Sequence, residues 1–366
     1  MAKPHWAFIH PFQLRIRRGI ESYVWALTRA LADTGVDIDI LTWQGPLKSP
    51  SLSSAPVTLR TVPRVRYYQQ IVAMPFYVLQ LLFNRYDHVF VNFAGYGEGP
   101  SLRLLGAIKN VPFSVVFHFP PTLVPHRYRE FERWRFQRDA THFIAVSDHV
   151  ASQVSEWSHR KCSVISHGVD TKNFRPDKEK RERTRASLGI SPDAHLLVTA
   201  AALEERKGIH FVIEALPAVL KTFPSTCYLI LGEGRYRKEL EALISKLGLQ
   251  RHVRFKGEVD DVENYLCAAD LGLLLSREEA LGIAVLEYAA SSLPVITSQE
   301  PPFDQFVNNS WGITADKTNS RQLSEMIKSL LADPARRATM GSAGRAWVEI
   351  NYSWQQVATD YRDLIH

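Results

Sequence analysis

The stretch from Leu271 to Ser298 constrains the fold of this chain more than any other. It contains two apolar runs of strand length, and an apolar segment of helical length lies between them, from about Gly282 to Ser291. The order strand, helix, strand is the repeating unit of a parallel α/β sheet. In such a sheet, ligands bind in the turns that leave the carboxyl ends of the strands. The sequence therefore predicts an α/β protein with a ligand site in the turn after the first of these strands.

Two glutamates lie in this stretch with seven residues between them. Glu279 falls in the turn before the helix, whereas Glu287 falls inside the helix. Glutamates near a helix are most often solvated surface charges, so the pair alone does not define a site. The backbone N–H groups of Gly282 and Ile283, at the start of the helix, are free to receive an anion. Glu279 is therefore a candidate for ligand contact.

Length and cysteine content indicate two domains in a reducing compartment. The 366 residues exceed what a single hydrophobic core normally serves. The three cysteines are odd in number and lack metal-ligand spacing, which is typical of buried thiols. We read no signal peptide at the N-terminus, and no apolar run approaches the ~20 residues of a membrane-spanning helix. The expected location is the cytoplasm.

The excess positive charge lies in the first half. Residues 1–170 contain 19 Lys and Arg against 12 Asp and Glu, whereas the remainder contains 25 against 26. An acidic substrate, an anionic membrane surface or nucleic acid would each suit a basic half. The sequence shows no zinc-finger spacing and no aromatic RNA-recognition signature, so nucleic acid is the least favoured partner.

Two segments of the first half combine arginines with aromatic residues. For the segment 65–87, a core helix that leads into the strand 88–92 is favoured over a helix in a membrane interface. The segment 126–142 carries five arginines among four aromatic residues. Either a solvated helix or a surface for anionic lipid explains it, so peripheral attachment at the inner face of the plasma membrane stays open.

Strands and helices alternate along both halves. The first strand, residues 5–10, should end at Pro11, and a helix and a second strand follow it. Each half has the pattern of a Rossmann-like domain, and the charged segment 171–185 marks the crossing between them. The predicted domains are residues 1–168 with the terminal helix 352–366, and residues 169–351.

Further candidate residues lie in turns that follow strands. His118 ends the strand 113–118, where a structural role and a functional role are equally compatible with its type and position. Lys207 stands at the start of a helix after the strand 196–201. Later turns carry Gly232 with Gly234, and Gly257, where the backbone can approach a ligand closely.

In this order, the turns resemble those of the retaining GT-B glycosyltransferases, the nucleotide-sugar-dependent group that includes bacterial mannosyl- and glucosyltransferases. The motifs that carry the resemblance are RRGIESYV, FIAVS, ISHGVDTKNFRP, ERKG, LGEG, VRFKGEV, AADLGLLLS, EALGIAVLE, PVITS and the helix after Tyr352. A single Gly-x-Gly is weak, but ten such pieces in order over nearly the whole chain identify the family. The resemblance implies the GT-B architecture, with two Rossmann-like domains facing a central cleft.

The resemblance also implies an activity. A sugar would pass from a nucleoside-diphosphate-sugar to a hydroxyl of a saccharide or lipid-linked acceptor, with retention of configuration and without a metal or other cofactor. Glu279 would bind hydroxyls of the donor sugar, and Glu287 would bind the ribose. Lys207 would neutralise charge on the leaving diphosphate, and His118 would face the sugar. The other implied donor-binding positions are Gly19, Arg18, Arg206, Gly232, Gly234, Lys256, Gly257, Glu258, Ala280, Leu281, Gly282 and Ile283.

The chain departs from the family pattern where a second cation is expected. An arginine usually stands five or six residues before the lysine, but here Ala202 and Ala201 occupy those positions. Arg206, Arg277 or Arg18 would have to supply the missing charge. Arg18 is the favoured candidate, because the first loop should face the diphosphate.

Two further departures concern His167 and an aspartate triplet. His167 replaces an asparagine that is common in the family. The triplet Asp37, Ile38, Asp39 resembles the metal-binding Asp-x-Asp of another class of sugar transferase. It lies at the start of a strand, on the side away from ligands, so a structural role is expected.

A non-catalytic subunit that binds nucleotide sugar and supports another transferase is the alternative to an enzyme. Retention of Lys207, Glu279 and Glu287 favours the enzyme, because a dead site has no chemical reason to keep all three. Phosphorolysis and epimerisation, which also occur on this fold, are less favoured functions.

Overall fold

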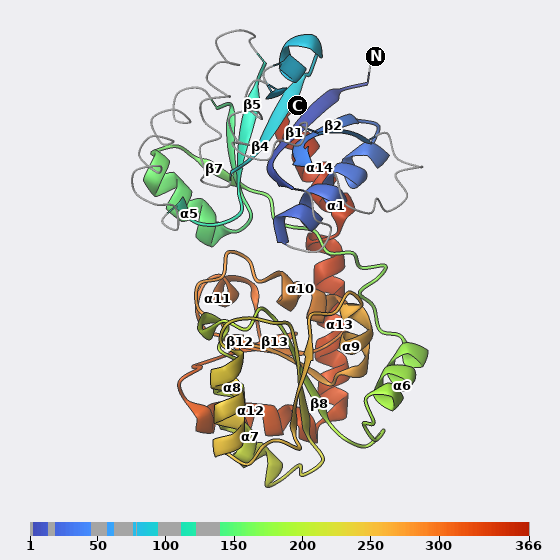
Figure 1. Ribbon diagram of the computed structural model, residues 1–366, viewed down its shortest axis with the longest axis vertical. Helices are drawn as coiled ribbons and strands as arrows, with labels where there is room; N and C mark the ends of the chain where they lie inside the picture. Colours follow the sequence, from blue (N-terminus) through green and yellow to red (C-terminus); the bar gives the residue numbers. More distant parts are fainter. Residues whose placement is uncertain are drawn as a thin grey trace. The chain divides into compact units, whose positions relative to one another are not determined.

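The computed structural model describes residues 3–13, 19–44, 57–61, 76–77, 79–93, 111–121 and 140–365. The chain divides into two compact units, one of Met1–Gly168 with Trp354–His366 and one of Val169–Ser353 (Figure 1). The sequence placed the domain limits after residues 168 and 351. Arg18 and most of the basic segment 126–142 lie outside the described residues.

Within its described residues, the first unit is built on a parallel sheet with the strand order β3-β2-β1-β4-β5-β6-β7. The strands are β1 (His5–Gln13), β2 (Asp37–Gln44), β3 (Val57–Thr61), β4 (His88–Phe93), β5 (Phe113–Phe117), β6 (His142–Ala145) and β7 (Cys162–Val164). The named helices are α1 (Gly19–Asp33), α5 (Asp148–Ser158) and α14 (Trp354–Ile365). β5 is buried at every position, as expected for a central strand covered on both faces.

The C-terminal helix α14 belongs to the first unit, so the chain crosses between the units twice. α14 lies beside α1 (Figure 1). Val357 and Tyr361 of α14 share one buried apolar cluster with Phe8 and Val24. The hydroxyl groups of Tyr23 and Tyr361 form a hydrogen bond between the two helices. The last residues of the chain therefore complete the core that its first residues begin.

Pro11 does not end the first strand, contrary to expectation. β1 continues to Gln13, and its register against β2 shifts between His10 and Gln13. A bulge is one of the few places in a sheet that accept proline, because the missing N–H is not required by the ladder there.

Asp39 has the structural role that the sequence predicted for its triplet. Asp39 is 2% exposed, and its carboxylate accepts hydrogen bonds from the Tyr86 hydroxyl and from Arg60 Nε, each at 2.6 Å. Arg60 lies on β3, so the aspartate joins neighbouring strands. The charge is compensated inside the unit by these two donors.

The described end of the segment 65–87 is a helix at 79–83 that leads into β4. Tyr77 and Leu81 are buried, whereas Phe83 is 83% exposed. The inward face of this segment therefore belongs to the core, as the sequence favoured. In the part of the chain that the structure describes, no helix is both long enough and apolar enough to cross a membrane.

The second unit is described throughout and carries a parallel sheet with the order β10-β9-β8-β11-β12-β13. The strands are β8 (Leu196–Ala200), β9 (Cys227–Leu231), β10 (Val253–Gly257), β11 (Leu271–Leu274), β12 (Val295–Ser298) and β13 (Gly312–Ala315). The helices are α6 (Lys178–Ser187), η2 (Glu205–Lys207), α7 (Ile209–Leu220), α8 (Arg237–Lys246), α9 (Val262–Ala268), α10 (Ile283–Ala290), α11 (Phe303–Phe306), α12 (Ser320–Ala332) and α13 (Pro334–Asn351). Both units are thus Rossmann-like, and the predicted α/β class is confirmed.

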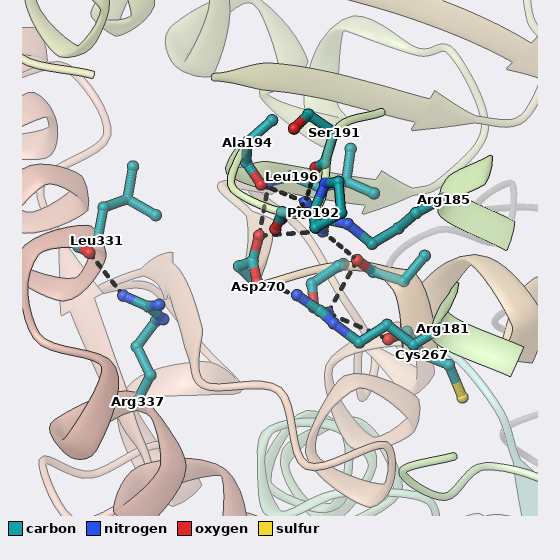
Figure 2. Close-up of polar contacts among 12 residues, drawn as sticks. Arg181, Arg185, Ser191, Pro192, Ala194, Leu196, Cys267, Asp270, Leu331 and Arg337 are labelled. Atoms are coloured by element: carbon teal, nitrogen blue, oxygen red, sulfur yellow. Dashed lines mark hydrogen bonds and ion pairs between the residues drawn. The ribbon is translucent and has the colours of Figure 1, made fainter. Parts of the chain in front are cut away.

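The charged segment 171–185 is part of the second unit, whereas the sequence placed the crossing there. Figure 2 shows the reason, which is a set of bonds from two arginines of α6. Arg181 donates to Asp270 Oδ1 at 2.6 Å and to the Ala268 carbonyl at 2.9 Å. Arg185 donates to the same carbonyl at 2.8 Å and pairs with the other oxygen of Asp270 at 3.4 Å. These bonds hold a very polar helix against the unit.

Candidate active site

The turns after β8 and β11 meet where the strand order of the second sheet reverses. The chain builds β8, β9 and β10 outward in one direction and then returns to place β11 on the other side of β8. The N–H of Arg277 donates to the Arg206 carbonyl at 2.8 Å, and the Ser276 hydroxyl donates to it at 3.0 Å. Two turns far apart in sequence are thereby joined. In open α/β sheets this reversal is the usual place for a ligand.

Lys207 and Glu279 form an ion pair across these two turns, with Lys207 Nζ donating to Glu279 Oε1. Their side chains are 15% and 11% exposed. Gly208 follows the lysine with φ +68°, and a Cβ at that position would overlap the Leu275 carbonyl. The glycine therefore allows the close approach that brings the two charges together.

The N-terminus of α10 lies directly after Glu279. Gly282 is the N-cap residue, and no side chain caps the helix. Gly282 has φ +79°, and a Cβ there would overlap the ring of Phe303, so this ring packs directly against the turn. The Tyr288 hydroxyl accepts the N–H of Ala200 at 2.6 Å, which fastens α10 to the end of β8. Uncapped N–H groups and the helix dipole together suit an anion at this place.

Glu287 is a partly buried carboxyl group in α10 without a hydrogen bond or ion pair to any described residue. Burial raises the pKa of Glu287 to about 7, and the charge of Glu263 adds to the shift. A buried acid of this kind gains stability when donors reach it, because hydrogen bonds to the charged form compensate the lost hydration. Hydroxyl groups of a ligand would be suitable donors.

The predicted glycine turn after β9 packs against the turn after β8, and it is bonded on its other side to Gly257 at the end of β10. A Cβ at Gly232, which has φ +134°, would overlap the Ala201 carbonyl, and one at Gly234 would overlap the Leu203 carbonyl. The N–H of Gly232 donates to the Gly257 carbonyl at 2.7 Å. The carboxyl edge of β8, β9 and β10 is therefore one continuous backbone surface. Of the remaining predicted positions, Lys256 and Glu258 flank Gly257, and Ala280, Leu281 and Ile283 flank Gly282.

The candidates for the second cation differ in what they bind. Arg206 already donates to Glu204 Oε2 at 2.7 Å and to the Glu278 carbonyl at 3.3 Å. Arg277 is exposed, and its guanidinium has no partner among the described residues. Arg18 falls outside the described residues, and its neighbour Gly19 begins α1.

His118 lies in the first unit, directly after β5, and both of its ring nitrogens are bonded there. Nε2 lies 2.8 Å from Asn92 Oδ1, and Nδ1 lies 3.0 Å from His167 Nε2. Burial lowers the pKa of His118 well below its ordinary value. The sequence did not single out Asn92. Its position near the carboxyl end of β4, the strand beside β5, was the available signal.

In the described ranges, no three His, Cys, Asp or Glu side chains are grouped so that they could hold a metal ion. The second unit instead offers one lysine, a helix N-terminus and two carboxyl groups at the reversal of its sheet. This combination of groups suits a ligand that is anionic at one end and rich in hydroxyl groups elsewhere.

Two family descriptions match consecutive parts of the chain. Glycosyltransferase Family 4 matches residues 17–173, and Glycosyl transferases group 1 matches residues 180–347. Together the two matches cover most of the chain, which therefore belongs to the GT-B-fold glycosyltransferases that these descriptions define.

Curated relatives match over a shorter length. A GDP-mannose-dependent monoacylated alpha-(1-6)-phosphatidylinositol monomannoside mannosyltransferase of Corynebacterium glutamicum is 35% identical over 208 residues, which cover 54% of this chain and 54% of the relative. A glycogen synthase of Mycobacterium tuberculosis is 30% identical over 234 residues, which cover 62% of this chain and 54% of that protein. The chain thus spans about half the length of the curated relatives that it matches.

Solved structures share the fold over nearly the whole chain. A glycosyltransferase from Rickettsia africae has a TM-score of 0.83 at 18% identity and covers 100% of this chain and 98% of its own. The Anabaena protein HepE, solved in complex with UDP-glucose, has a TM-score of 0.81 at 18% identity and covers 99% of each chain. At this identity the likeness concerns the fold, and the predicted GT-B class is confirmed.

Proposed function

We propose that this protein transfers a sugar from a nucleoside-diphosphate-sugar to a hydroxyl group of a saccharide or lipid-linked saccharide, with retention of configuration. The observation that carries the proposal is the Lys207–Glu279 pair beside the uncapped N-terminus of α10, in a chain of this family. A diphosphate needs positive charge, and a sugar needs hydrogen-bond acceptors. Lys207 supplies the positive charge and Glu279 supplies the acceptor oxygens, and the two groups are in direct contact.

The ion pair is compatible with donor binding because an ammonium group has three donors. Lys207 can keep Glu279 as a partner while another N–H reaches the diphosphate. Glu279 then accepts hydrogen bonds from sugar hydroxyls, and the N–H groups at the start of α10 take a phosphate oxygen. The charge that grows on the leaving diphosphate is stabilised by groups already in place, which is the largest contribution in many enzymes.

Glu287 is proposed to bind the ribose of the donor. Its carboxyl group has no partner among the described residues, and two neighbouring ribose hydroxyls would supply the hydrogen bonds that burial makes valuable. Such bonds favour the ionised acid, so donor binding should release a proton below about pH 7.

In the proposed reaction, the bond between the sugar C1 and the diphosphate oxygen breaks, and the acceptor oxygen forms a bond to C1 on the same face. The acceptor's proton passes to the leaving phosphate. Neither a protein nucleophile nor a protein base takes part. Lys207 and the helix N-terminus meet the charge of the diphosphate, so the proposal includes no divalent metal.

The acceptor and the location are proposed from two separate observations. Relatives include enzymes named for phosphatidylinositol monomannoside and for lipopolysaccharide core biosynthesis, which supports a lipid-linked or surface-glycan acceptor. The basic first half supports peripheral binding to the anionic inner face of a membrane, with the protein otherwise in the cytoplasm.

Nucleotide release from a panel of UDP-, GDP- and ADP-sugars tests the proposal. We expect slow hydrolysis of at least one donor, faster when a glycan or lipid-linked acceptor is present. Lys207→Ala is the matched inactive control. If no donor in the panel releases nucleotide although a nucleotide sugar binds measurably, the enzymatic proposal is overturned and the non-catalytic subunit is supported.

A further inference from the structure

A buried chain of polar groups runs along the carboxyl edge of the first sheet. Asn92 Nδ2 lies 3.1 Å from the Ile9 carbonyl, and Asn92 Oδ1 lies 2.8 Å from His118 Nε2. His118 Nδ1 lies 3.0 Å from His167 Nε2. The three side chains belong to residues that are 1%, 6% and 5% exposed. Each group can therefore be assigned as donor or acceptor without reference to water.

The backbone carbonyl at one end fixes the direction of every bond. A carbonyl oxygen only accepts, so the Asn92 amide nitrogen must face Ile9 and its oxygen must face His118. That oxygen also only accepts, so His118 Nε2 carries the proton. In a neutral ring, Nδ1 is then bare and accepts from the Nε2–H of His167.

Burial supports the neutral state of both rings. It lowers the pKa of His118 well below its ordinary value and lowers the pKa of His167 to about 3. The other titratable groups that face the pair are His10 and Tyr23, and the Tyr23 hydroxyl is bonded in turn to Tyr361. The pKa of His10 is itself lowered by burial to about 4, and burial raises the pKa values of both tyrosines. No carboxylate is described beside either ring that would favour a charged imidazole.

The ring of His167 is held in one orientation. The Tyr23 ring stacks on it with the centroids 4.3 Å apart and the planes 26° apart, and the same ring meets His118 edge-on at 4.8 Å. The next residue, Gly168, packs so closely on the Trp354 indole that a Cβ would overlap it. His167 is thus positioned by stacking from the side and by a close-packed backbone.

We propose that His167 is a positioning residue that holds His118 as the neutral tautomer with its proton on Nε2, so that His118 serves sugar transfer as a hydrogen-bond donor and never as a base. The part of this inference that concerns transfer rests on the proposed function. The part that concerns the tautomer does not.

The tautomer restricts the chemistry open to His118. A substrate group can take over the Nε2–H from Asn92 only if it is an acceptor, which fits a hydroxyl oxygen of a sugar. Nε2 has no free electron pair to receive a proton from the acceptor alcohol. The lone pair on Nδ1 is used by His167. The acceptor's proton must therefore leave by another route, and the leaving phosphate provides one.

Nitrogen-15 NMR of the full-length protein with labelled histidine tests the tautomer directly. Long-range proton–nitrogen correlations distinguish a bare ring nitrogen from a protonated one, and His118→Gln identifies the signals of that ring. Near pH 7, we expect a protonated Nε2 and a bare Nδ1. A charged His118 ring, or a proton on Nδ1, would overturn the inference.

Two variants of His167 separate positioning from packing. His167→Phe keeps an aromatic ring against Tyr23 but donates no hydrogen bond, whereas His167→Asn restores an N–H donor. We expect the phenylalanine variant to show a mixture of His118 tautomers and a kcat about tenfold lower, the loss of one hydrogen bond of about 1.4 kcal/mol. The asparagine variant should recover most of this loss, and the affinity of both variants for UDP or GDP should match that of the wild type.

Unchanged tautomer and kcat in His167→Phe would overturn the positioning role, as would an asparagine variant no better than the phenylalanine one. If no donor in the panel is turned over, the proposed function fails while the wild-type NMR spectrum still decides the tautomer. The two failures are therefore distinct results.

Discussion

Replacement of Glu287 by glutamine tests both the partly buried carboxyl group of α10 and its proposed contact with the donor ribose. The carboxyl group is partly buried without a partner among the described residues, and its pKa is about 7 instead of the usual 4.5. In the unfolded chain the acid ionises near its usual pKa. Between these two values the unfolded state loses its proton first, so the folded state becomes less stable as the pH rises. Above about pH 7 both states are ionised, and the full penalty is present.

The size of the penalty follows from the two pKa values. A difference of about 2.5 units at 1.36 kcal/mol per unit corresponds to about 3 kcal/mol, an upper value because the residue is only partly buried. Glu287→Gln is neutral at every pH and escapes this cost. The variant should therefore be more stable than the wild type by up to about 3 kcal/mol at pH 8.5 and by almost nothing at pH 4.5.

Urea unfolding of both proteins across this pH range measures the difference. Glu239→Gln is a suitable control, because Glu239 is an exposed glutamate on α8 and its replacement should change stability by less than about 0.5 kcal/mol at either pH. The same Glu287→Gln protein should bind UDP and GDP more weakly if the carboxylate holds the ribose. A stability gain that is equal at both pH values, or absent at high pH, would refute the reasoning about the buried acid.

Three further predictions concern the other charged groups. Glu279→Ala should lower turnover at least about a hundredfold while calorimetric affinity for UDP or GDP is kept or rises, because Lys207 loses its competing partner; parallel loss of nucleotide binding would contradict this role. Arg18→Ala should weaken donor binding about tenfold, the effect of one charge-assisted hydrogen bond, with Arg277→Ala as the comparison; intact donor affinity and turnover in the Arg18 variant would show that another group is the second cation. Asp270→Ala should lower the free energy of unfolding by about 3 kcal/mol or more, because the buried Arg185 and the partly exposed Arg181 lose their counter-charge; a change below about 1 kcal/mol in urea unfolding would exclude this anchoring.

The second unit could be predicted in some detail because its signals are local. An apolar run of strand length predicted β11, and the segment from Gly282 to Ser291 predicted a helix that the structure places at Ile283–Ala290. The turns that follow strands in sequence are also the turns that lie at the carboxyl edge of the sheet. Lys207 and Glu279 could thus be assigned to one edge before any geometry was known.

The pairings of side chains could not be predicted in the same way. His118 bonds to residues 26 and 49 positions away, and both bonds depend on strand register and on the path of a turn. The position of α6 depends in the same way on Asp270, more than eighty residues later. Composition marked that segment as a linker because it is charged. Two of its arginines, Arg181 and Arg185, instead bind Asp270 and backbone carbonyls that only the folded unit brings together.

The glycine contacts explain why the charges at the sheet reversal are fixed before a ligand arrives. Gly208, in the turn after β8, packs directly on Leu275 at the end of β11. Gly232 and Gly234, in the turn after β9, pack directly on the turn after β8. A side chain at Gly208 would push apart the turns that carry Lys207 and Glu279, and one at Gly232 or Gly234 would push the turn after β9 away from the turn after β8. The backbone therefore holds the pair in place, and a diphosphate has only to share the lysine. Transition-state charge is best stabilised by groups that need no reorganisation, so these glycines contribute to the proposed catalysis although none of them carries a reactive group.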